Sequence, residues 1–139
     1  MGLKEQIIDP HYEGMRRGDI AGVTSVLHPD VISNLPGAPP MHGLEPFKGF
    51  VQAFIDAFPD ANIQSDRVWE SGDTVVSEGV YSGTHKGPLV GNGMTVPPTG
   101  KRIAFHFLDI FQVRDGKAYE HNVYFDQGEL MQQLGLMPG

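Results

Sequence analysis

Ionisable side chains gather in one apolar stretch near the end of the chain. Residues 105–127, FHFLDIFQVRDGKAYEHNVYFDQ, are rich in aromatic and β-branched side chains on both sides of an Asp-Gly turn signal, which predicts a β-hairpin. The hairpin contains Asp109 and two of the six histidines of the chain, His106 and His121. A carboxylate beside an imidazole in an apolar cavity fixes the ring tautomer and raises the basicity of the ring. Such a pair is suited to take a proton from a carbon acid or from water.

The length of the turn decides which of these side chains share a face of the hairpin. A two-residue loop on Asp115-Gly116 pairs Arg114 with Lys117, whereas a three-residue loop places Val113 opposite Lys117. The two loops differ in register by one residue, which moves the faces of one strand relative to the other. We favour the three-residue loop, because it separates a nearly all-apolar face from a mixed one.

In the favoured register Asp109 and His121 are direct cross-strand neighbours on an otherwise aromatic face. This placement predicts an acid/base dyad inside an apolar cavity. The alternative is a structural pair that satisfies its own hydrogen bonds and holds the strands in register.

The opposite face of the hairpin carries a second set of polar residues, His106, Asn122, Tyr124 and Asp126. If this face lines the cavity, Asp126 is the acid/base and His106 and Tyr124 orient a carbonyl group. If it meets solvent or a second subunit, these groups have no chemical role. Two histidines and a carboxylate also suit a non-haem metal ion, but His106 and His121 point to opposite faces in this register, so we expect no metal.

The clearest helix signal lies in residues 44–58, LEPFKGFVQAFIDAF. Its apolar side chains recur every three or four residues, as they do on one face of an amphipathic helix. Two earlier segments, 3–17 and 20–27, also show helical periodicity. Pro10 should disturb or restart the first helix, and Asp19 is placed to cap the second.

The apolar pattern changes to a period of two after residue 59, which predicts strands in the second half of the chain. Hairpin turns are expected at 71–73 and 115–116, and a long loop rich in Gly and Pro is expected over 86–101. A short strand that breaks into a loop is expected over 28–40. The chain should close with a short helix or an ordered tail.

Helices followed by antiparallel strands indicate one α+β domain over residues 1–139. We expect a cone-shaped barrel, in which a curved antiparallel sheet wraps around the N-terminal helices and leaves an apolar interior open at one end. Such an interior is a natural site for a small molecule. The residues expected to contact that molecule are Tyr12, Phe54, Trp69, Phe107, Asn122 and Tyr124. For Tyr12 and Trp69 the alternative is packing in the core.

The composition is typical of a soluble globular protein. The chain has 139 residues, of which 40% are hydrophobic, and a net charge of −7. Negative charge without a basic cluster argues against a nucleic-acid partner. The absence of cysteine excludes disulfides and thiolate sites. Since the sequence shows neither a signal peptide nor a membrane-spanning apolar run, we expect a cytoplasmic protein without a membrane partner.

Several short motifs occur together in the second half of the chain. They are Gly83-Thr84-His85, Pro97-Pro98-Thr99-Gly100, Asp109-Ile110-Phe111, Asp115-Gly116-Lys117, Glu120-His121 and the QQLG segment near the end. Together they resemble the SnoaL-like polyketide cyclases, also called ester cyclases. These proteins belong to the superfamily that shares the nuclear transport factor 2 fold, so the resemblance implies the same cone-shaped domain.

The resemblance implies a cofactor-free intramolecular aldol ring closure on polyaromatic esters, with one aspartate as the acid/base. Asp126 is one candidate for that aspartate. The other alignment places it at Asn122, where an amide cannot act as a base. Related proteins of this fold are epoxide hydrolases, isomerases, dehydratases or non-enzymatic binders.

The residues and the resemblance together predict a cofactor-independent acid/base enzyme that acts on a small hydrophobic carbonyl compound. The favoured dyad is Asp109 with His121, and His106 and Asp126 belong to the second set. We also expect a homodimer formed through the sheet. The alternatives are a non-catalytic binder of a hydrophobic molecule, or an isomerase or hydrolase with the same type of cavity.

Overall fold

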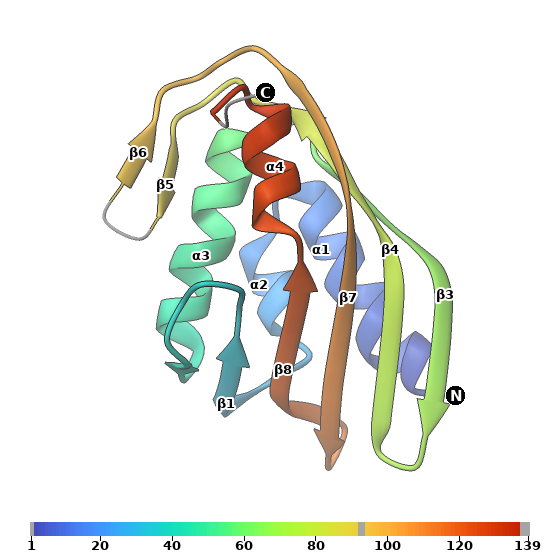
Figure 1. Ribbon diagram of the computed structural model, residues 1–139. Helices are drawn as coiled ribbons and strands as arrows, with labels where there is room; N and C mark the ends of the chain where they lie inside the picture. The colour runs from blue at the N-terminus through green and yellow to red at the C-terminus, as the bar shows by residue number, and fades with distance from the viewer. Residues whose placement is uncertain (1, 92–93, 137–139) are drawn as a thin grey trace.

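A curved six-stranded sheet with helices packed on one of its faces forms the body of the protein (Figure 1). The structure is a computed structural model that describes residues 2–91 and 94–136. The strands of the sheet are β1 (Leu27–Asn34), β2 (Met41–His42), β3 (Asn62–Ser71), β4 (Thr74–Thr84), β7 (Arg102–Arg114) and β8 (Lys117–Phe125). Their order across the sheet is β2-β1-β8-β7-β4-β3. This architecture confirms the expected α+β fold.

One pair of strands runs parallel. β1 lies parallel to β8, with Ile32 opposite Glu120 and Asn34 opposite Asn122. The expected antiparallel arrangement is confirmed for β3, β4, β7 and β8, and β1 is the exception. A tight turn forces two strands to run antiparallel, but most of the chain separates β1 from β8, so no turn sets their relative direction.

The first helical segment changes from a π-helical to an α-helical turn next to its proline, so the helix is disturbed there, as the sequence predicts, but it is not interrupted. A π-helical turn over Lys4–Ile8 continues into α1 (Asp9–Arg17), and Pro10 lies in the first turn of α1. Proline is tolerated there because the amide groups of a first helical turn have no partner inside the helix. Gly18 ends α1 in the left-handed conformation, with φ of 66°.

The second helix is capped as expected but is shorter. In α2 (Ile20–Thr24) the Asp19 carboxylate accepts a hydrogen bond from the Gly22 amide at 3.1 Å. The sequence predicts a helix as far as residue 27, but Leu27 is instead the first residue of β1.

The long amphipathic helix is confirmed as α3 (Leu44–Ala57). Phe47 and Val51 are fully buried against the sheet, whereas Phe50 and Phe54 are half-buried beside them. Figure 1 shows α3 next to α1 and α2 on the same face of the sheet. None of the helices in the described part of the chain is long and apolar enough to cross a membrane.

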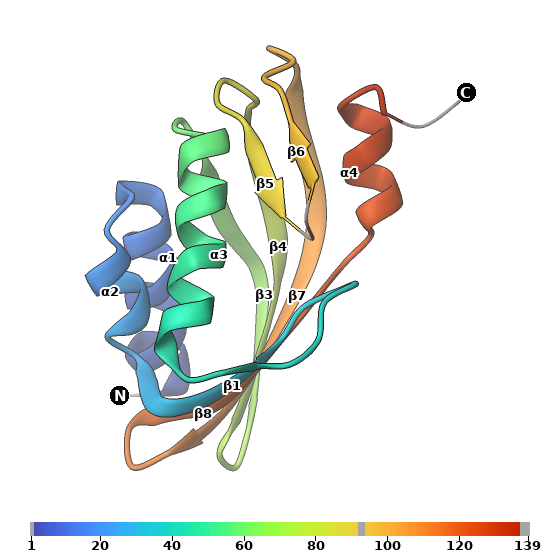
Figure 2. The same cartoon turned by 90° about the vertical axis from the view of Figure 1, so that its left-hand side faces the viewer.

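The segment expected to be a loop over 86–101 contains a small separate hairpin. Its strands are β5 (Leu89–Gly91) and β6 (Met94–Val96), and Figure 2 shows this hairpin beside α3 at the upper end of the molecule. These strands were not predicted because Gly and Pro are unfavourable in strands, and each strand is too short to show an alternating pattern. Residues 92–93 of the expected loop lie outside the described residues.

A short helix, α4 (Gln127–Gln133), follows the sheet as expected. Figure 2 shows it at the same end of the molecule as the β5–β6 hairpin. Residues 137–139 of the expected tail lie outside the described residues.

The β7–β8 hairpin has the two-residue turn, so the expected three-residue loop is wrong. Asp115 and Gly116 both have positive φ, 53° and 77°, and Arg114 pairs with Lys117. This backbone is typical of a type I′ turn, whose twist matches that of the two strands.

A β-bulge in β8 nevertheless restores the predicted faces. Val113 pairs with Ala118, but the preceding Gln112 pairs with Glu120, so one extra residue, Tyr119, is accommodated in β8. Beyond the bulge the strands are offset by one further residue, and the apolar and mixed faces separate as they would after a three-residue loop.

Candidate active site

A small apolar cavity lies between α1, α3 and the inner face of the sheet. Its volume is about 60 Å³, and most of its lining is aromatic or aliphatic. The polar side chains that line it are His11, Tyr81, Asp109 and His121. Asp109 and His121 both lie on the apolar face of the β7–β8 hairpin, so this is the face that lines the cavity.

Asp109 and His121 form a buried hydrogen-bonded pair. The Asp109 Oδ1 and His121 Nε2 atoms are 3.0 Å apart, and the two residues are only 4% and 2% exposed. They are not direct cross-strand neighbours as expected, because the bulge places His121 opposite Phe111 and Asp109 opposite Val123. The contact is diagonal, and long side chains on one face of a sheet span that separation.

The aromatic ring of Phe111 fixes the plane of the His121 imidazole. The two rings are stacked, with centroids 4.1 Å apart and planes inclined by 10°. Phe47 of α3 presents its ring to His121 from another side, with centroids 5.5 Å apart in an edge-to-face arrangement. Packing on several sides restricts rotation of the imidazole and keeps Nε2 directed at Asp109.

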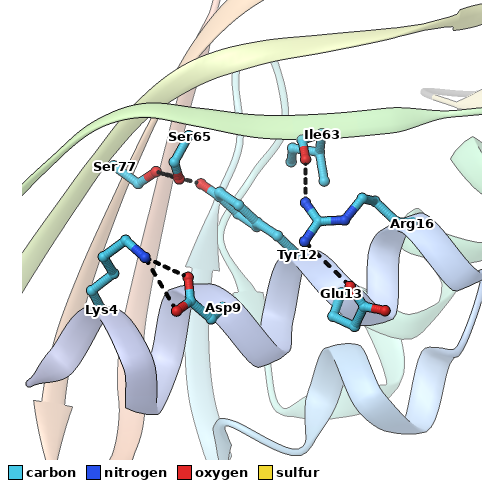
Figure 3. A network of polar contacts seen from close by, with 8 residues as sticks. All are labelled: Lys4, Asp9, Tyr12, Glu13, Arg16, Ile63, Ser65 and Ser77. Atoms are coloured by element: carbon cyan, nitrogen blue, oxygen red, sulfur yellow. Dashed lines mark hydrogen bonds and ion pairs between the residues drawn. The ribbon is translucent and has the colours of Figure 1, made fainter. Parts of the chain in front are cut away.

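The second oxygen of Asp109 is held by Tyr12 of α1. The Tyr12 hydroxyl lies 2.5 Å from Asp109 Oδ2 and 2.9 Å from Ser77 Oγ, and Ser77 lies 2.8 Å from Ser65 Oγ. Figure 3 shows Tyr12 reaching from α1 to these two serines on β3 and β4. A hydroxyl has one proton and a carboxylate only accepts, so Tyr12 donates to Asp109 and Ser77 donates to the Tyr12 oxygen.

The Tyr12 hydroxyl stays protonated at all ordinary pH values. Burial raises the pKa of Tyr12 well above its usual value, and the neighbouring Asp109 carboxylate raises it further. Tyr12 therefore acts as a fixed hydrogen-bond donor to Asp109. It was expected to contact a bound molecule, but it lies behind the carboxylate and is not among the residues that line the cavity.

These hydrogen bonds define the state of His121. Because Asp109 is an acceptor, the Nε2 atom of His121 carries the proton, and in the neutral ring Nδ1 keeps its lone pair. Nδ1 is buried and has no hydrogen-bond partner within the described residues. The site thus contains an oriented imidazole with one free basic nitrogen.

His11 is a member of the site that the sequence analysis did not identify. Its Nδ1 donates to the Val23 carbonyl oxygen at 2.9 Å, which leaves Nε2 with the lone pair, and its ring lies edge-on to His121 with centroids 5.5 Å apart. Burial lowers the pKa of His11 to about 4, and the nearby His121 lowers it as well. His11 is therefore neutral at pH 7. It lies four residues after the buried Ile7, a helical spacing that could have revealed it.

The second set of polar residues lies on the outer face of the hairpin. His106, Asp126 and Tyr124 are exposed, Tyr124 by 55%. The Asp126 carboxylate caps α4 by accepting from the Gly128 amide at 2.8 Å, and Asn122 accepts a hydrogen bond from Asn34 at 2.7 Å. None of these four residues is among the described residues that line the cavity.

Only some of the residues expected to contact a bound molecule line the cavity. Phe54 and Phe107 line the cavity. Trp69 instead is 47% exposed, because its neighbour Val68 occupies the inner face of β3 and successive side chains alternate. Within the described part of the chain, no three histidine, aspartate or glutamate side chains converge as a metal site requires.

Two of the short sequence motifs are joined by a buried histidine. His85, at the end of the Gly83-Thr84-His85 motif, has no exposed surface, and its Nδ1 accepts a hydrogen bond from the Thr99 amide at 3.1 Å. The His85 carbonyl also accepts from the Gly100 amide at 2.8 Å. These contacts fasten the segment before β7 to the end of β4.

Comparison with known proteins agrees with this architecture. The model of the SnoaL-like polyketide cyclase family matches residues 6–134, and the chain belongs to that family. No curated protein matches the chain.

Three solved structures illustrate the similarity. IdmH, a candidate polyketide cyclase from Streptomyces antibioticus, is 28% identical, with a TM-score of 0.80 over 97% of this chain and 99% of its own. A candidate polyketide cyclase from Bacillus cereus is 26% identical, with a TM-score of 0.76 over 95% of this chain and 80% of its own. AclR, a candidate hydroxylase from Streptomyces galilaeus, is 23% identical, with a TM-score of 0.82 over 99% of this chain and 89% of its own, and shows the shared fold.

Proposed function

We propose that this protein is a cofactor-independent general-base enzyme for a small hydrophobic carbonyl compound, with ring closure by intramolecular aldol addition as its reaction. The observation that carries this proposal is the 3.0 Å contact between Asp109 and His121 in the wall of an apolar cavity. Membership of the SnoaL-like polyketide cyclase family supports the same reaction class.

His121 is the base in this mechanism. Both oxygens of Asp109 already accept hydrogen bonds, from Tyr12 and from His121, so the free lone pair in the dyad is Nδ1 of His121. Nδ1 takes the proton from the carbon next to the substrate carbonyl, and the imidazolium that forms stays paired with the Asp109 carboxylate. An apolar surrounding strengthens that pairing relative to water.

We assign the enolate oxygen to Tyr81, a residue that lines the cavity. It has the one hydroxyl among the described residues that line the cavity, and this hydroxyl makes no hydrogen bond to another described residue. Burial raises the pKa of Tyr81, so the group remains a donor. A hydrogen-bond donor that reaches the oxygen on which negative charge develops lowers the barrier.

The remaining steps balance without a cofactor. The enolate carbon attacks a second carbonyl of the same molecule, a carbon–carbon bond forms, and the π electron pair of that carbonyl moves to its oxygen. The His121 imidazolium then returns its proton to this alkoxide. His11 assists because it is neutral, so the imidazolium at His121 meets no second positive charge beside it.

The outer face of the sheet is where we place a second copy of the chain. Ile32, Trp69 and Tyr124 are large hydrophobic side chains that are 38%, 47% and 55% exposed. Exposed apolar surface often indicates a place where another protein chain binds. We therefore assign these three side chains to the contact with the second copy. Sedimentation analysis should show a dimer for the wild type and a larger monomer fraction for Tyr124→Glu, and a wild-type monomer would contradict this arrangement.

Non-catalytic binding of a hydrophobic molecule is the second candidate function. One observation favours it, namely that Asp109 is fully engaged by Tyr12 and His121, as it would be in a purely structural pair. In that case the cavity would bind an apolar molecule without changing it.

Deuterium exchange at a carbon acid separates the two functions. β-Tetralone is a neutral, flat ketone with acidic hydrogens beside its carbonyl, and its exchange with heavy water can be followed by proton NMR. We expect the wild type to accelerate exchange, and His121→Gln to abolish the acceleration, because glutamine keeps an N–H donor for Asp109 but has no basic lone pair.

Two controls complete this experiment. His106→Gln makes the same change at an exposed histidine of the outer face and should exchange β-tetralone as the wild type does. Calorimetric titration should show that the wild type and His121→Gln bind β-tetralone equally well. Binding without acceleration in the wild type would identify a binding protein and overturn the catalytic proposal.

A further inference from the structure

We propose that an apolar groove outside the cavity binds the uncharged remote part of the substrate while its reacting carbonyl end occupies the cavity. The substrate is then a neutral, elongated carbonyl compound with a hydrocarbon-like tail. This inference rests on the proposed function, because it takes the cavity beside His121 as the place of the reaction.

The groove is larger than the cavity and lies at one end of the molecule. Its volume is about 390 Å³, and its walls come from α3, the β5–β6 hairpin, the segment after β1, and α4. The views in Figures 1 and 2 show α3, the hairpin and α4 together at that end. None of the described residues that line the groove has a charged side chain or a hydroxyl, amide or imidazole group.

Two phenylalanines of α3 separate the groove from the cavity. Phe50 and Phe54 line both spaces, and their ring centroids are 4.9 Å apart. They lie one helical turn apart, so their rings stand side by side on the same face of α3. Both are only half-buried, so their side chains have room to rotate, and such a rotation would join the two spaces.

The sizes of the two spaces determine what each can hold. Sites for small molecules usually enclose roughly 300–1,000 Å³. At about 60 Å³ the cavity can enclose only the reacting end of a substrate, whereas the groove at about 390 Å³ falls within the usual range. Continuity through Phe50 and Phe54 makes the groove the place for the rest of the same molecule.

The chemistry of the lining defines the tail. A carboxylate or phosphate in the groove would lose its hydration and gain no partner, and such burial is strongly unfavourable. An alkyl chain or unsubstituted ring gains from leaving water in proportion to the apolar area that it buries. The groove therefore selects hydrocarbon over charged substituents.

Gly49 is the position at which a larger side chain can be introduced into this groove. It lies on the exposed side of α3 and lines the groove, and a Cβ added there meets no atom within 4 Å. Gly49→Leu fills groove volume without a backbone clash, and leucine is a better helix former than glycine. Gln52→Leu is the matched control, because it adds the same side chain to an exposed position of α3 that does not line the groove.

Calorimetric titration with two probes tests the inference. The probes are β-tetralone and a β-tetralone that carries a hexyl chain on its aromatic ring. We expect the wild type and Gln52→Leu to bind the hexyl probe at least about ten-fold more tightly than β-tetralone. Gly49→Leu should lose most of this advantage, with a much smaller loss of affinity for β-tetralone and an unchanged circular dichroism spectrum.

Other outcomes overturn the inference. Equal affinity of the wild type for both probes, or an undiminished hexyl advantage in Gly49→Leu, would show that the groove does not take the tail. An equal loss for both probes in Gly49→Leu would place the whole molecule in the groove. If the expected pattern appears but the wild type does not accelerate deuterium exchange in β-tetralone, the groove is confirmed and the catalytic proposal fails.

Discussion

Asp109 and His121 meet diagonally across the β7–β8 hairpin, with their side-chain atoms 3.0 Å apart, although neither residue is the direct partner of the other. The bulge at Tyr119 creates this relationship, because it brings His121 opposite Phe111 and onto the inner face. Tyr12 holds the other oxygen of Asp109 from α1, so the pair is fixed from both sides.

Replacement of Asp109 by asparagine should abolish the acceleration of β-tetralone exchange. The amide cannot stabilise a positive His121, so we expect exchange to slow by about 100-fold or more. Stability should fall by roughly 1–3 kcal/mol, since one of the two donors loses its acceptor. Proton NMR measures the exchange, and urea denaturation measures the free energy of unfolding.

Asp126→Asn is the matched control for this substitution. Asparagine caps a helix about as well as aspartate, so α4 and the exchange rate should both be unchanged. Loss of exchange in Asp126→Asn with normal exchange in Asp109→Asn would move the acid/base to the outer face.

Tyr12→Phe should destabilise the protein and slow exchange. The variant removes the donor to Asp109, and loss of a hydrogen bond to a charged group costs about 1.5–3 kcal/mol. Tyr124→Phe removes an exposed hydroxyl and should change the free energy of unfolding by less than about 0.5 kcal/mol. Similar losses in the two variants, measured by urea denaturation, would show that the Tyr12 hydroxyl contributes nothing specific.

His11 should make the protein less stable as the pH falls. Its pKa is about 4 in the folded state against 6.5 for the free side chain, so the unfolded chain binds a proton first. His11 makes its full contribution to the free energy of unfolding above about pH 6.5. This contribution declines as the pH falls towards 4, by about 3 kcal/mol in total.

His11→Asn tests this pH dependence. Asparagine places an N–H near the position of Nδ1 and so keeps a donor for the Val23 carbonyl, but it does not titrate. Denaturation between pH 7 and pH 4 should show a smaller loss of stability in the variant than in the wild type. Parallel curves for the two proteins would show that His11 is not held neutral by burial.

Gly14→Ala should separate α1 from α2. A Cβ at Gly14 would lie 2.5 Å from the Val23 amide nitrogen, closer than any real Cβ contact. We expect a loss of more than about 1 kcal/mol in urea denaturation, although alanine is the better helix former. Gly49→Ala, where a Cβ meets nothing within 4 Å, should instead stabilise by about 0.5–1 kcal/mol. The same sign of change in both variants would contradict this packing.

Periodic features of the fold could be predicted from the sequence, whereas local backbone irregularities could not. The helix at 44–58 and the Asp19 cap depend on patterns within one segment, and the structure contains both. The two-residue turn at 115–116 and the bulge at Tyr119 each shift the strand register by one residue relative to the prediction, and the two shifts together leave the same side chains on each face. The two faces of the hairpin were therefore predicted correctly, although the length of the loop was not. A bulge adds one residue without a distinctive composition, which is why the sequence does not show it.

The candidate site was partly predicted for a similar reason. Asp109 and His121 stand out because they interrupt an apolar strand pattern. His11 does not stand out, because its importance depends on tertiary packing that brings α1 against β8. The outer set of polar residues fits a pattern equally well, and only the three-dimensional arrangement separates it from the cavity.

The nitrogen chemical shifts of His121 give the most direct test of the proposed base. In the neutral ring, the hydrogen bond to Asp109 predicts a protonated Nε2 and an unprotonated Nδ1, which nitrogen-15 NMR distinguishes. Addition of β-tetralone should perturb the Nδ1 resonance, because that atom meets the acidic carbon. A protonated Nδ1 in the neutral ring, unaffected by β-tetralone, would contradict the assignment of His121 as the general base.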